Sequence, residues 1–223
     1  PQPVRDKVLA DRGLKTSLPA QGQSSRYAHR DAQINEYLLS NLTRKLHLGA
    51  GGNVLDGWLN TDIAPQSDGV MAINVTEPLP FDAATFDFVY SEHMIEHLTL
   101  EQGVRLMQEL FRVTRSGAFV RVATPELARV LALFSKEPTP TQQSYVDWTT
   151  KTFIGQIEGY NPTLVLNNMF YNWGHRFIYD HNMLAAIMQN AGFTALKAHP
   201  IGRSDQAHLT NIEHHGAAMG AED

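Results

Sequence analysis

The alternation of hydrophobic and polar residues between residues 44 and 123 predicts an α/β fold. Short runs rich in apolar and β-branched residues are expected to form strands. They comprise residues 45–48, 58–63, 70–75, 86–91 and 118–123. Between the last two, Thr99 and Gln102 fit a capping box that starts an amphipathic helix, and Gly117 should end it. A strand, a helix and a strand at this spacing form a βαβ unit, so the sheet should be mostly parallel.

The flanking regions are predicted to be largely helical. Residues 1–43 are polar and form an N-terminal helical arm or lid, in which Asp31 would cap a helix. Residues 44–223 form one sheet domain, and residues 125–172 are a helical insertion that would act as a cap. A further amphipathic helix would start after Asp180.

Two weaker strands are predicted near the end of the sequence, at residues 193–198 and 209–213. They would bring the sheet to seven strands. Only nine residues separate Leu48 from Trp58, which is too few for the usual crossover helix. The first crossover is therefore expected to be shortened to a turn or a loop.

Composition narrows the class of function. The net charge is −5 and the pI about 6.1, which disfavours a sequence-independent nucleic-acid binder. There is no cysteine, which excludes disulfide scaffolds, thiol nucleophiles and iron–sulfur clusters. The longest purely apolar run, residues 131–134, is far shorter than the roughly 20 residues of a membrane span. No signal-peptide pattern opens the sequence, so we expect a cytoplasmic protein without membrane contacts, and a homodimer is compatible with this.

A glycine-rich turn and an acid follow the first two predicted strands. The turn is Gly49-Ala50-Gly51-Gly52, where the backbone can approach a ligand closely. A dinucleotide fingerprint would need glycine at Val54, and the Gly-Lys-Ser/Thr of a P-loop is absent. Asp62 ends the second strand, where an acid can accept hydrogen bonds from a ribose diol.

These motifs resemble class I S-adenosylmethionine-dependent methyltransferases, in particular the small type 11-like group. Residues 44–62 carry R-K-L-H-L-G-A-G-G and D-G-W-L-N-T-D, and three further stretches follow in the family's order. They are L-P-F-D-x-x-x-F-D-F-V-Y from 79, E-H-M-I-E-H-L from 92 and W-G-H-R-F-I-Y-D from 173. The resemblance implies a Rossmann-like seven-stranded sheet with S-adenosylmethionine across the carboxyl ends of strands one, two and four.

The resemblance also implies roles for individual residues. The glycine turn would face the methionine part of the cofactor, Asp62 the ribose, and the ends of strands three and four the adenine and the amino-acid end. The implied cofactor-binding residues are Gly49, Ala50, Gly51, Gly52, Asp62, Ile63, Asn74, Val75, Ser91 and Glu92. Asn74 stands where the family commonly has Asp, so its side-chain carbonyl would receive the adenine amino group.

Ten histidines give the sequence a second possible chemistry. His93, Glu96 and His97 fit an H-x-x-E-H zinc pattern, which makes a zinc hydrolase the competing hypothesis. The pattern follows a strand end directly, however, and no third ligand is evident, so we expect no metal. We expect His93, His97 and His175 to be the candidate catalytic bases, with a structural role as the alternative for each.

The implied reaction is direct transfer of a methyl group to a small-molecule acceptor in a biosynthetic pathway or secondary metabolism. We expect an oxygen acceptor, including an anionic carboxylate or phosphonate, with N-methylation and a non-catalytic binding module as alternatives. Cationic, hydroxyl and aromatic side chains would bind this acceptor. The candidates are Tyr27, Arg30, Tyr171, Arg176 and Tyr179.

Overall fold

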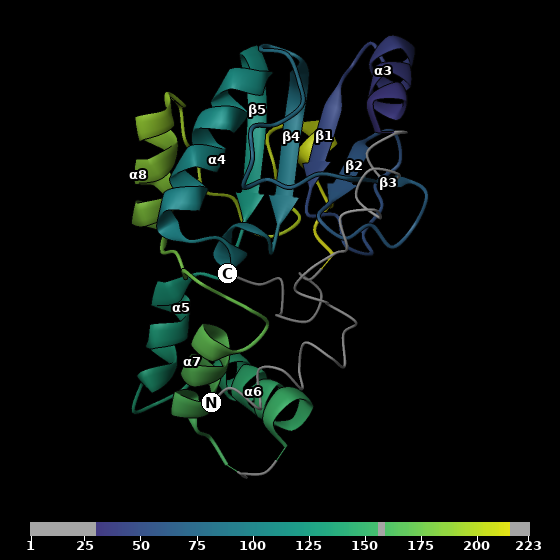
Figure 1. Cartoon of the computed structure of the whole chain (residues 1–223). Coiled ribbons are helices and arrows are strands. Elements are labelled where there is room, and N and C mark those ends of the chain that lie inside the picture. Colours follow the sequence, from purple (N-terminus) through teal and green to yellow (C-terminus); the bar gives the residue numbers. More distant parts are fainter. Residues whose placement is uncertain (1–29, 156–158, 215–223) are drawn as a thin grey trace. The chain divides into compact units, whose positions relative to one another are not determined.

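The computed structural model describes residues 30–155 and 159–214 (Figure 1). The chain divides into two compact units, residues 1–42 and residues 43–223. In the first unit the described element is helix α3, Arg30–Ser40. Asp31 lies within its first turn, where the positive end of the helix dipole stabilises a carboxylate.

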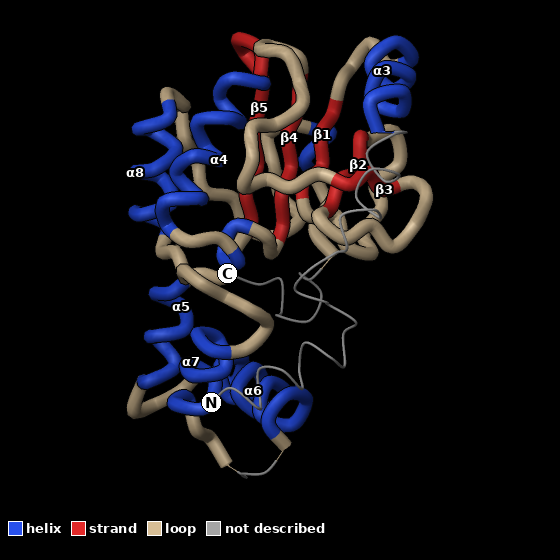
Figure 2. Tube along the Cα trace, in the orientation of Figure 1, coloured by secondary structure: helices blue, strands red, loops and turns tan. Residues whose placement is uncertain are grey.

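The second unit is built on a sheet of five parallel strands (Figure 2). The strands are β1 Lys45–Leu48, β2 Leu59–Asp62, β3 Val70–Ala72, β4 Phe86–Glu92 and β5 Thr114–Ala123. Their order is β3-β2-β1-β4-β5, and every neighbouring pair is parallel. This confirms the Rossmann-like, mostly parallel fold. The order reverses between β1 and β4, and ligands of such sheets bind at the carboxyl ends of the strands at this point.

The central strands are buried because helices or loops cover both faces of a parallel sheet. Leu46 and Leu48 of β1 and Val89 of β4 are fully buried. His47 is also buried, with Nδ1 3.0 Å from Asn60 Oδ1 and its ring 4.9 Å from that of Tyr90. Burial lowers the pKa of His47, so this histidine is a packed core residue.

The first crossover and the long helix follow the sequence signals closely. The described residues 49–58 form turns and contain no helix, as predicted. Helix α4, Leu100–Val113, starts with the predicted capping box: Gln102 N donates to Thr99 Oγ1 at 3.3 Å and Thr99 N donates to Gln102 Oε1 at 3.0 Å. The predicted helix end at Gly117 is wrong. Strand β5 begins directly after α4, and Gly117, with a φ of 79°, lies within it.

The sheet has five described strands rather than seven, so the strands predicted at 193–198 and 209–213 are wrong. Ala195 and Asn211 each have a φ of 54°, which interrupts an extended backbone. The segment instead carries a single 3-10 turn, η4, Ala207–Leu209, and packs Leu209 against Trp58 and Tyr90 on the sheet.

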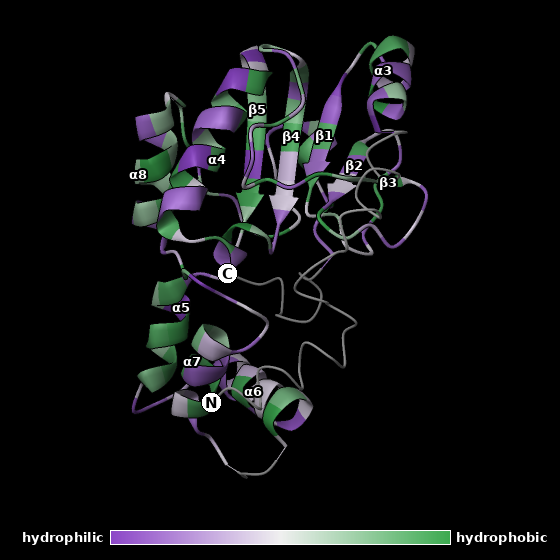
Figure 3. Cartoon of the chain, in the orientation of Figure 1, coloured by the Kyte–Doolittle hydropathy of each residue, from purple (hydrophilic) through white to green (hydrophobic). Residues whose placement is uncertain are grey.

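The insertion after β5, called the cap below, is helical and has its own apolar core. Its elements are α5 Leu127–Leu131, η2 Ala132–Phe134, α6 Pro140–Thr149, η3 Thr150–Ile154, which is a π-helix, and α7 Pro162–Tyr171. Figure 3 shows α5 almost entirely hydrophobic. The core residues are Val130, Leu133, Val146, Val165, Met169 and Ile178.

After the cap the chain returns to the sheet. Helix α8, His181–Ala191, packs beside α4 (Figure 1). Asp180 caps it as predicted, because its Oδ1 accepts from Met183 N at 2.7 Å, and Gly192 ends it with a φ of 113°. In the part of the chain that the structure describes, no helix combines the length and hydrophobicity needed to cross a bilayer.

Candidate functional site

The glycine turn after β1 lies at the point where the strand order reverses. Gly49 and Gly51 have φ values of 70° and 51°, in the left-handed region that favours glycine. A Cβ at Gly49 would come within 2.6 Å of Met94 Cγ, whereas a Cβ at Gly51 would meet nothing within 4 Å. Gly49 is therefore required by both backbone and packing, while the backbone beside Gly51 stays open to a ligand.

Asp62, at the end of β2, is bonded to this turn. Its Oδ2 accepts a hydrogen bond from Gly51 N at 3.0 Å, and its Oδ1 accepts one from Ala64 N at 2.8 Å. A carboxylate offers about four acceptor positions, so capacity remains for the hydroxyls of a ligand. The structure thus joins the predicted turn and the predicted acid into one feature.

The other predicted cofactor residues also lie at strand ends, but they differ in availability. Asn74 Oδ1 accepts from Thr76 N at 3.1 Å and from Thr76 Oγ1 at 2.8 Å. Its carbonyl would therefore have to leave this turn to bind adenine. Glu92 is buried and accepts from His214 N at 3.0 Å, beside buried Ser91. Gly52 and Ile63 are exposed, and Val75 is half-buried.

His93 follows β4 and is held by a buried carboxylate. Its φ of 47° is unusual for a residue with a side chain, and its amide donates to Ala123 O at 3.0 Å. His93 Nδ1 lies 3.0 Å from Glu96 Oε1, and Thr124 Oγ1 donates to Glu96 Oε2 at 3.1 Å. Glu96 is fully buried, and both of its carboxylate oxygens have hydrogen-bond partners, as buried polar groups usually do. The contact with Glu96 Oε1 fixes the orientation of the His93 imidazole.

The pKa values of this pair shift in opposite directions. Burial lowers the pKa of His93, but the hydrogen bond and the charge of Glu96 outweigh it, and the net pKa is raised. Burial raises the pKa of Glu96, but His93 outweighs it, and the net pKa is lowered. The pair therefore favours the imidazolium and the carboxylate.

His97 and His175 meet from distant parts of the sequence. Their ring centroids lie 4.9 Å apart with the rings nearly perpendicular, at 76°. His175 Nδ1 is 2.7 Å from Met169 O. A carbonyl oxygen only accepts, so Nδ1 carries the proton and the free lone pair of His175 is on Nε2. Arg176 N donates to Glu96 O at 2.7 Å, which fastens this segment beside Glu96.

The H-x-x-E-H pattern does not form the helical zinc site that the competing hypothesis requires. His93 lies in a left-handed turn after β4, whereas Glu96 and His97 lie in η1, Ile95–His97, a single 3-10 turn. Ligand atoms of Glu96, His97 and His175 lie within 4.8 Å of one another. The residues that converge thus include His175, which the pattern does not contain, and leave out His93.

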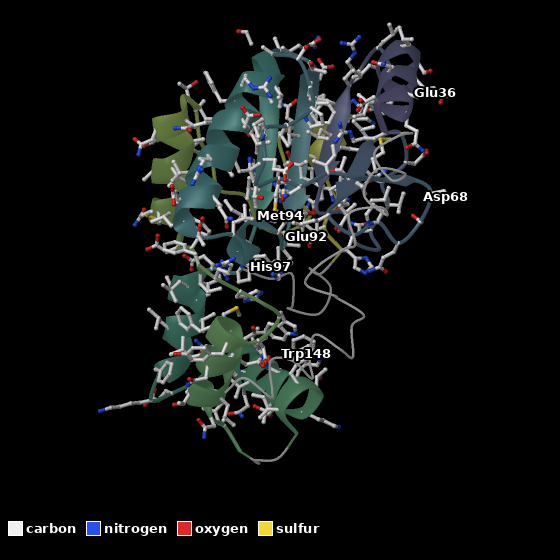
Figure 4. All side chains as sticks on the ribbon, in the orientation of Figure 1. Glu36, Asp68, Glu92, Met94, His97 and Trp148 are labelled. Atoms are coloured by element: carbon white, nitrogen blue, oxygen red, sulfur yellow. The ribbon has the colours of Figure 1, made fainter. Side chains whose placement is uncertain are left out.

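An aromatic path leads from these histidines into the cap. The Trp173 ring lies 5.5 Å from that of His175 and 4.9 Å from that of Phe153, which lies 5.3 Å from Trp148. Trp148 is 40% exposed and Phe153 41%. Figure 4 places Glu92 and His97 at the carboxyl end of the sheet and Trp148 on α6 in the cap.

The five predicted acceptor residues do not gather at one place. Tyr27 lies outside the described residues, and Arg30 belongs to the first unit, where its Nε donates to Asp31 at 2.9 Å. Tyr171 is 82% exposed, and Arg176 is exposed. Tyr179 is buried, with its hydroxyl against Gly103 of α4.

Three residues near the histidines were missed by sequence reasoning. Thr124 directly follows β5, and a polar residue at a strand's carboxyl end is a signal that was available. Trp148 and Phe153 lie on α6 and η3, where no short-range pattern distinguishes a site residue from a core aromatic. Only the folded cap brings them towards Trp173.

The strand order defines a Rossmann-like α/β protein, and the candidate site lies at the reversal point of its sheet. A family model described as a methyltransferase domain matches residues 60–122, from β2 to β5. The match confirms the resemblance to class I methyltransferases that the motifs indicated. A search of curated proteins found no match.

Solved structures of methyltransferases are similar to this chain at low sequence identity. A SAM dependent methyltransferase from Archaeoglobus fulgidus is 18% identical, with 77% of this chain and 71% of that chain covered and a TM-score of 0.48. A SAM-dependent methyltransferase from Thermotoga maritima is 15% identical, with 77% and 81% covered and a TM-score of 0.43. PigF with SAH is 12% identical, with 79% and 62% covered and a TM-score of 0.43. Assignment of the fold rests on the strand order and the family match, not on these similarities.

Proposed function

We propose that the protein transfers the methyl group of S-adenosylmethionine to a small-molecule acceptor, with oxygen as the acceptor atom. The observation that carries the proposal is the bond between the Asp62 carboxylate and the Gly51 amide at the reversal point of the sheet. An acid bonded to an open stretch of backbone at this point would suit the ribose hydroxyls of the cofactor. The family match over residues 60–122 supports the same reaction.

In this proposal the glycine turn receives the methionine part of the cofactor and Asp62 the ribose. The methyl group of a sulfonium is already activated, so the protein mainly aligns the acceptor behind it and excludes water. The ends of β1 and β4 lie side by side, which puts His93, the residue directly after β4, next to the turn. A cofactor in the turn would therefore have the histidines on its acceptor side.

Calorimetric titration of the chain with S-adenosylhomocysteine, the demethylated product, tests the cofactor. We expect one molecule bound per chain, and at least tenfold weaker binding for Asp62→Asn, because the amide nitrogen of asparagine would face either the Gly51 donor or the Ala64 donor. The matched control is Asp68→Asn, which changes an exposed acid in the loop before β3 (Figure 4). Equal binding by both variants, or no binding by the unaltered chain, would reject the proposed cofactor site.

Three features support a small acceptor with an oxygen nucleophile. The net charge of −5 disfavours a nucleic-acid acceptor. The half-exposed rings of Trp148 and Phe153 offer an apolar surface for a flat molecule. The Glu96 carboxylate orients the His93 ring at the end of β4, and an imidazole is a group that can exchange a proton with a hydroxyl acceptor or donate to a carboxylate.

The acceptor atom can be tested with S-adenosylmethionine labelled in its methyl group and a panel of phenols, carboxylic acids and amines. We expect label in the oxygen compounds and at least a 100-fold lower kcat for His93→Gln, in the range usual for loss of a positioned acid or base. His181→Gln, on the exposed first turn of α8, is the control. Label found only in amines would replace oxygen by nitrogen in the proposal.

A further inference from the structure

We infer that Glu96, His97 and His175 form a binding site for a divalent transition-metal ion. Their ligand atoms lie within 4.8 Å of one another, at the junction between the end of β4 and the segment that leaves the cap. The inference concerns metal binding alone and does not depend on the proposed methyl transfer.

The surroundings of these residues match those of metal ligands. Metal-binding histidines usually donate their second ring N–H to a carbonyl or a carboxylate, which aims the other nitrogen at the ion. His175 does this with Met169 O at 2.7 Å. The Glu96 carboxylate is likewise held from outside the cluster, by Thr124 Oγ1 at 3.1 Å and His93 Nδ1 at 3.0 Å. Glu96 and His175 are therefore oriented before any ion arrives.

The cluster also brings buried charge and backbone strain to one place. Glu96 is fully buried, and a metal ion would add a second cation beside the carboxylate that already pairs with His93. His93 and Trp173 have φ values of 47° and 57°, and such strained residues concentrate at functional sites. The hydrogen bonds from the Arg176 and Phe177 amides to Glu96 O, 2.7 and 3.2 Å long, hold the two strained segments together.

The ligand set defines the class of ion. Two imidazoles and one carboxylate suit Zn²⁺ and its first-row neighbours, whereas Mg²⁺ and Ca²⁺ prefer oxygen ligands throughout. Tetrahedral zinc with bonds of about 2.0–2.1 Å holds its ligand atoms about 3.3 Å apart. The side chains would thus approach by at most about 1.5 Å from the 4.8 Å limit, which rotation of the half-buried rings of His97 and His175 can supply. Three protein ligands leave a position open for water or for an oxygen of a bound molecule.

Metal titration of the untagged full chain, stripped with a chelator, tests the inference. We expect calorimetry to show one Zn²⁺ per chain with a Kd below about 10 µM. Co²⁺ should compete for the site and give visible absorption bands of a low-coordinate ion. His97→Asn and His175→Asn should each weaken Zn²⁺ binding at least about 100-fold, and Thr124→Val about 10-fold or more through Glu96.

The control is His181→Asn, which removes an exposed imidazole of α8. Circular dichroism melting of each variant separates loss of metal from loss of fold, and Thr124→Val retains all three ligands. No saturable Zn²⁺ or Co²⁺ binding by the unaltered chain would overturn the inference. Equal binding by the control and by folded variants of His97 and His175 would overturn it as well. Either result leaves binding of S-adenosylhomocysteine, measured without metal, as a separate test of the proposed function.

Discussion

The contact between Gly103 and Tyr179 tests whether this tyrosine packs in the core or binds an acceptor. Gly103 is the fourth residue of α4, where alanine would favour the helix by about 1 kcal/mol. A Cβ there would collide with the Tyr179 hydroxyl, although it would lie 3.6 Å from Cζ of the same ring and 3.7 Å from Ile95 Cγ1. The buried hydroxyl has no hydrogen-bond partner among the described residues. The Tyr179 hydroxyl thus leaves no room for an alanine side chain at position 103, and it forms no hydrogen bond with the described residues.

The expected free energies follow from this geometry. Gly103→Ala alone gains about 1 kcal/mol of helix propensity and loses about 2 kcal/mol to overpacking, a net loss of about 1 kcal/mol. Tyr179→Phe removes an unsatisfied buried hydroxyl and should gain about 1 kcal/mol. The double variant keeps both gains without the collision and should be about 2 kcal/mol more stable than the natural protein. The stability changes of the two single variants sum to about zero, so the coupling free energy between positions 103 and 179 is about 2 kcal/mol.

Urea unfolding of the four proteins, followed by circular dichroism, measures this cycle. Thermal melting should show a rise of about 4–8 °C for the double variant, since 1 kcal/mol shifts the Tm of a chain this long by about 2–4 °C. Burial raises the pKa of Tyr179 to about 12, so its hydroxyl stays neutral throughout. Additivity within about 0.5 kcal/mol would refute the steric reasoning. A tenfold loss of turnover in Tyr179→Phe with unchanged stability would restore the acceptor role expected from the sequence.

Two further predictions concern the glycine turn and the far end of α4. Gly51→Ala should lower the free energy of unfolding by about 1 kcal/mol, because the residue has a positive φ. Gly49→Ala should lower it by about 3 kcal/mol, because its new Cβ would also collide with Met94. Equal losses of the two variants in urea unfolding would contradict this. The hydrogen bond from Arg112 lowers the pKa of Glu109, so their pairing stabilises the fold above pH 4.5 and loses this effect as the pH falls through the lowered pKa. The stability difference between the natural protein and Glu109→Gln should therefore shrink between pH 6 and pH 3, and a constant difference would rule the linkage out.

Local signals explain how much of the fold the sequence predicts. The capping box at Thr99, the cap at Asp180 and the short crossover after Leu48 each depend on residues a few positions apart, and the structure confirms all three. The change from α4 to β5 was misplaced because Gly117 has the left-handed conformation typical of a helix end but adopts it inside a strand. The register of β5 relative to β4 also shifts between Phe86 and Phe88, and no local sequence pattern predicts such a shift.

The end of the chain shows a second limit of local patterns. Residues 193–198 and 209–213 have strand-like composition, but a strand also needs a neighbour to pair with and a backbone free of positive φ. Ala195 and Asn211 break the extended conformation. Glu213 instead forms a buried ion pair with Arg121 of β5, which fixes the segment by side chains rather than by backbone pairing.

The two halves of the candidate site differ in how they arise, and this decides what a sequence can reveal about each. The half formed by Gly51 and Asp62 depends on the ends of two adjacent strands, so its residues lie close in sequence and form a motif. The half formed by His97 and His175 depends on the cap folding back until a backbone amide reaches Glu96, so its residues share no motif. Motifs therefore indicate the cofactor, whereas the choice of acceptor, and any metal beside it, has to be determined from the packing of the cap.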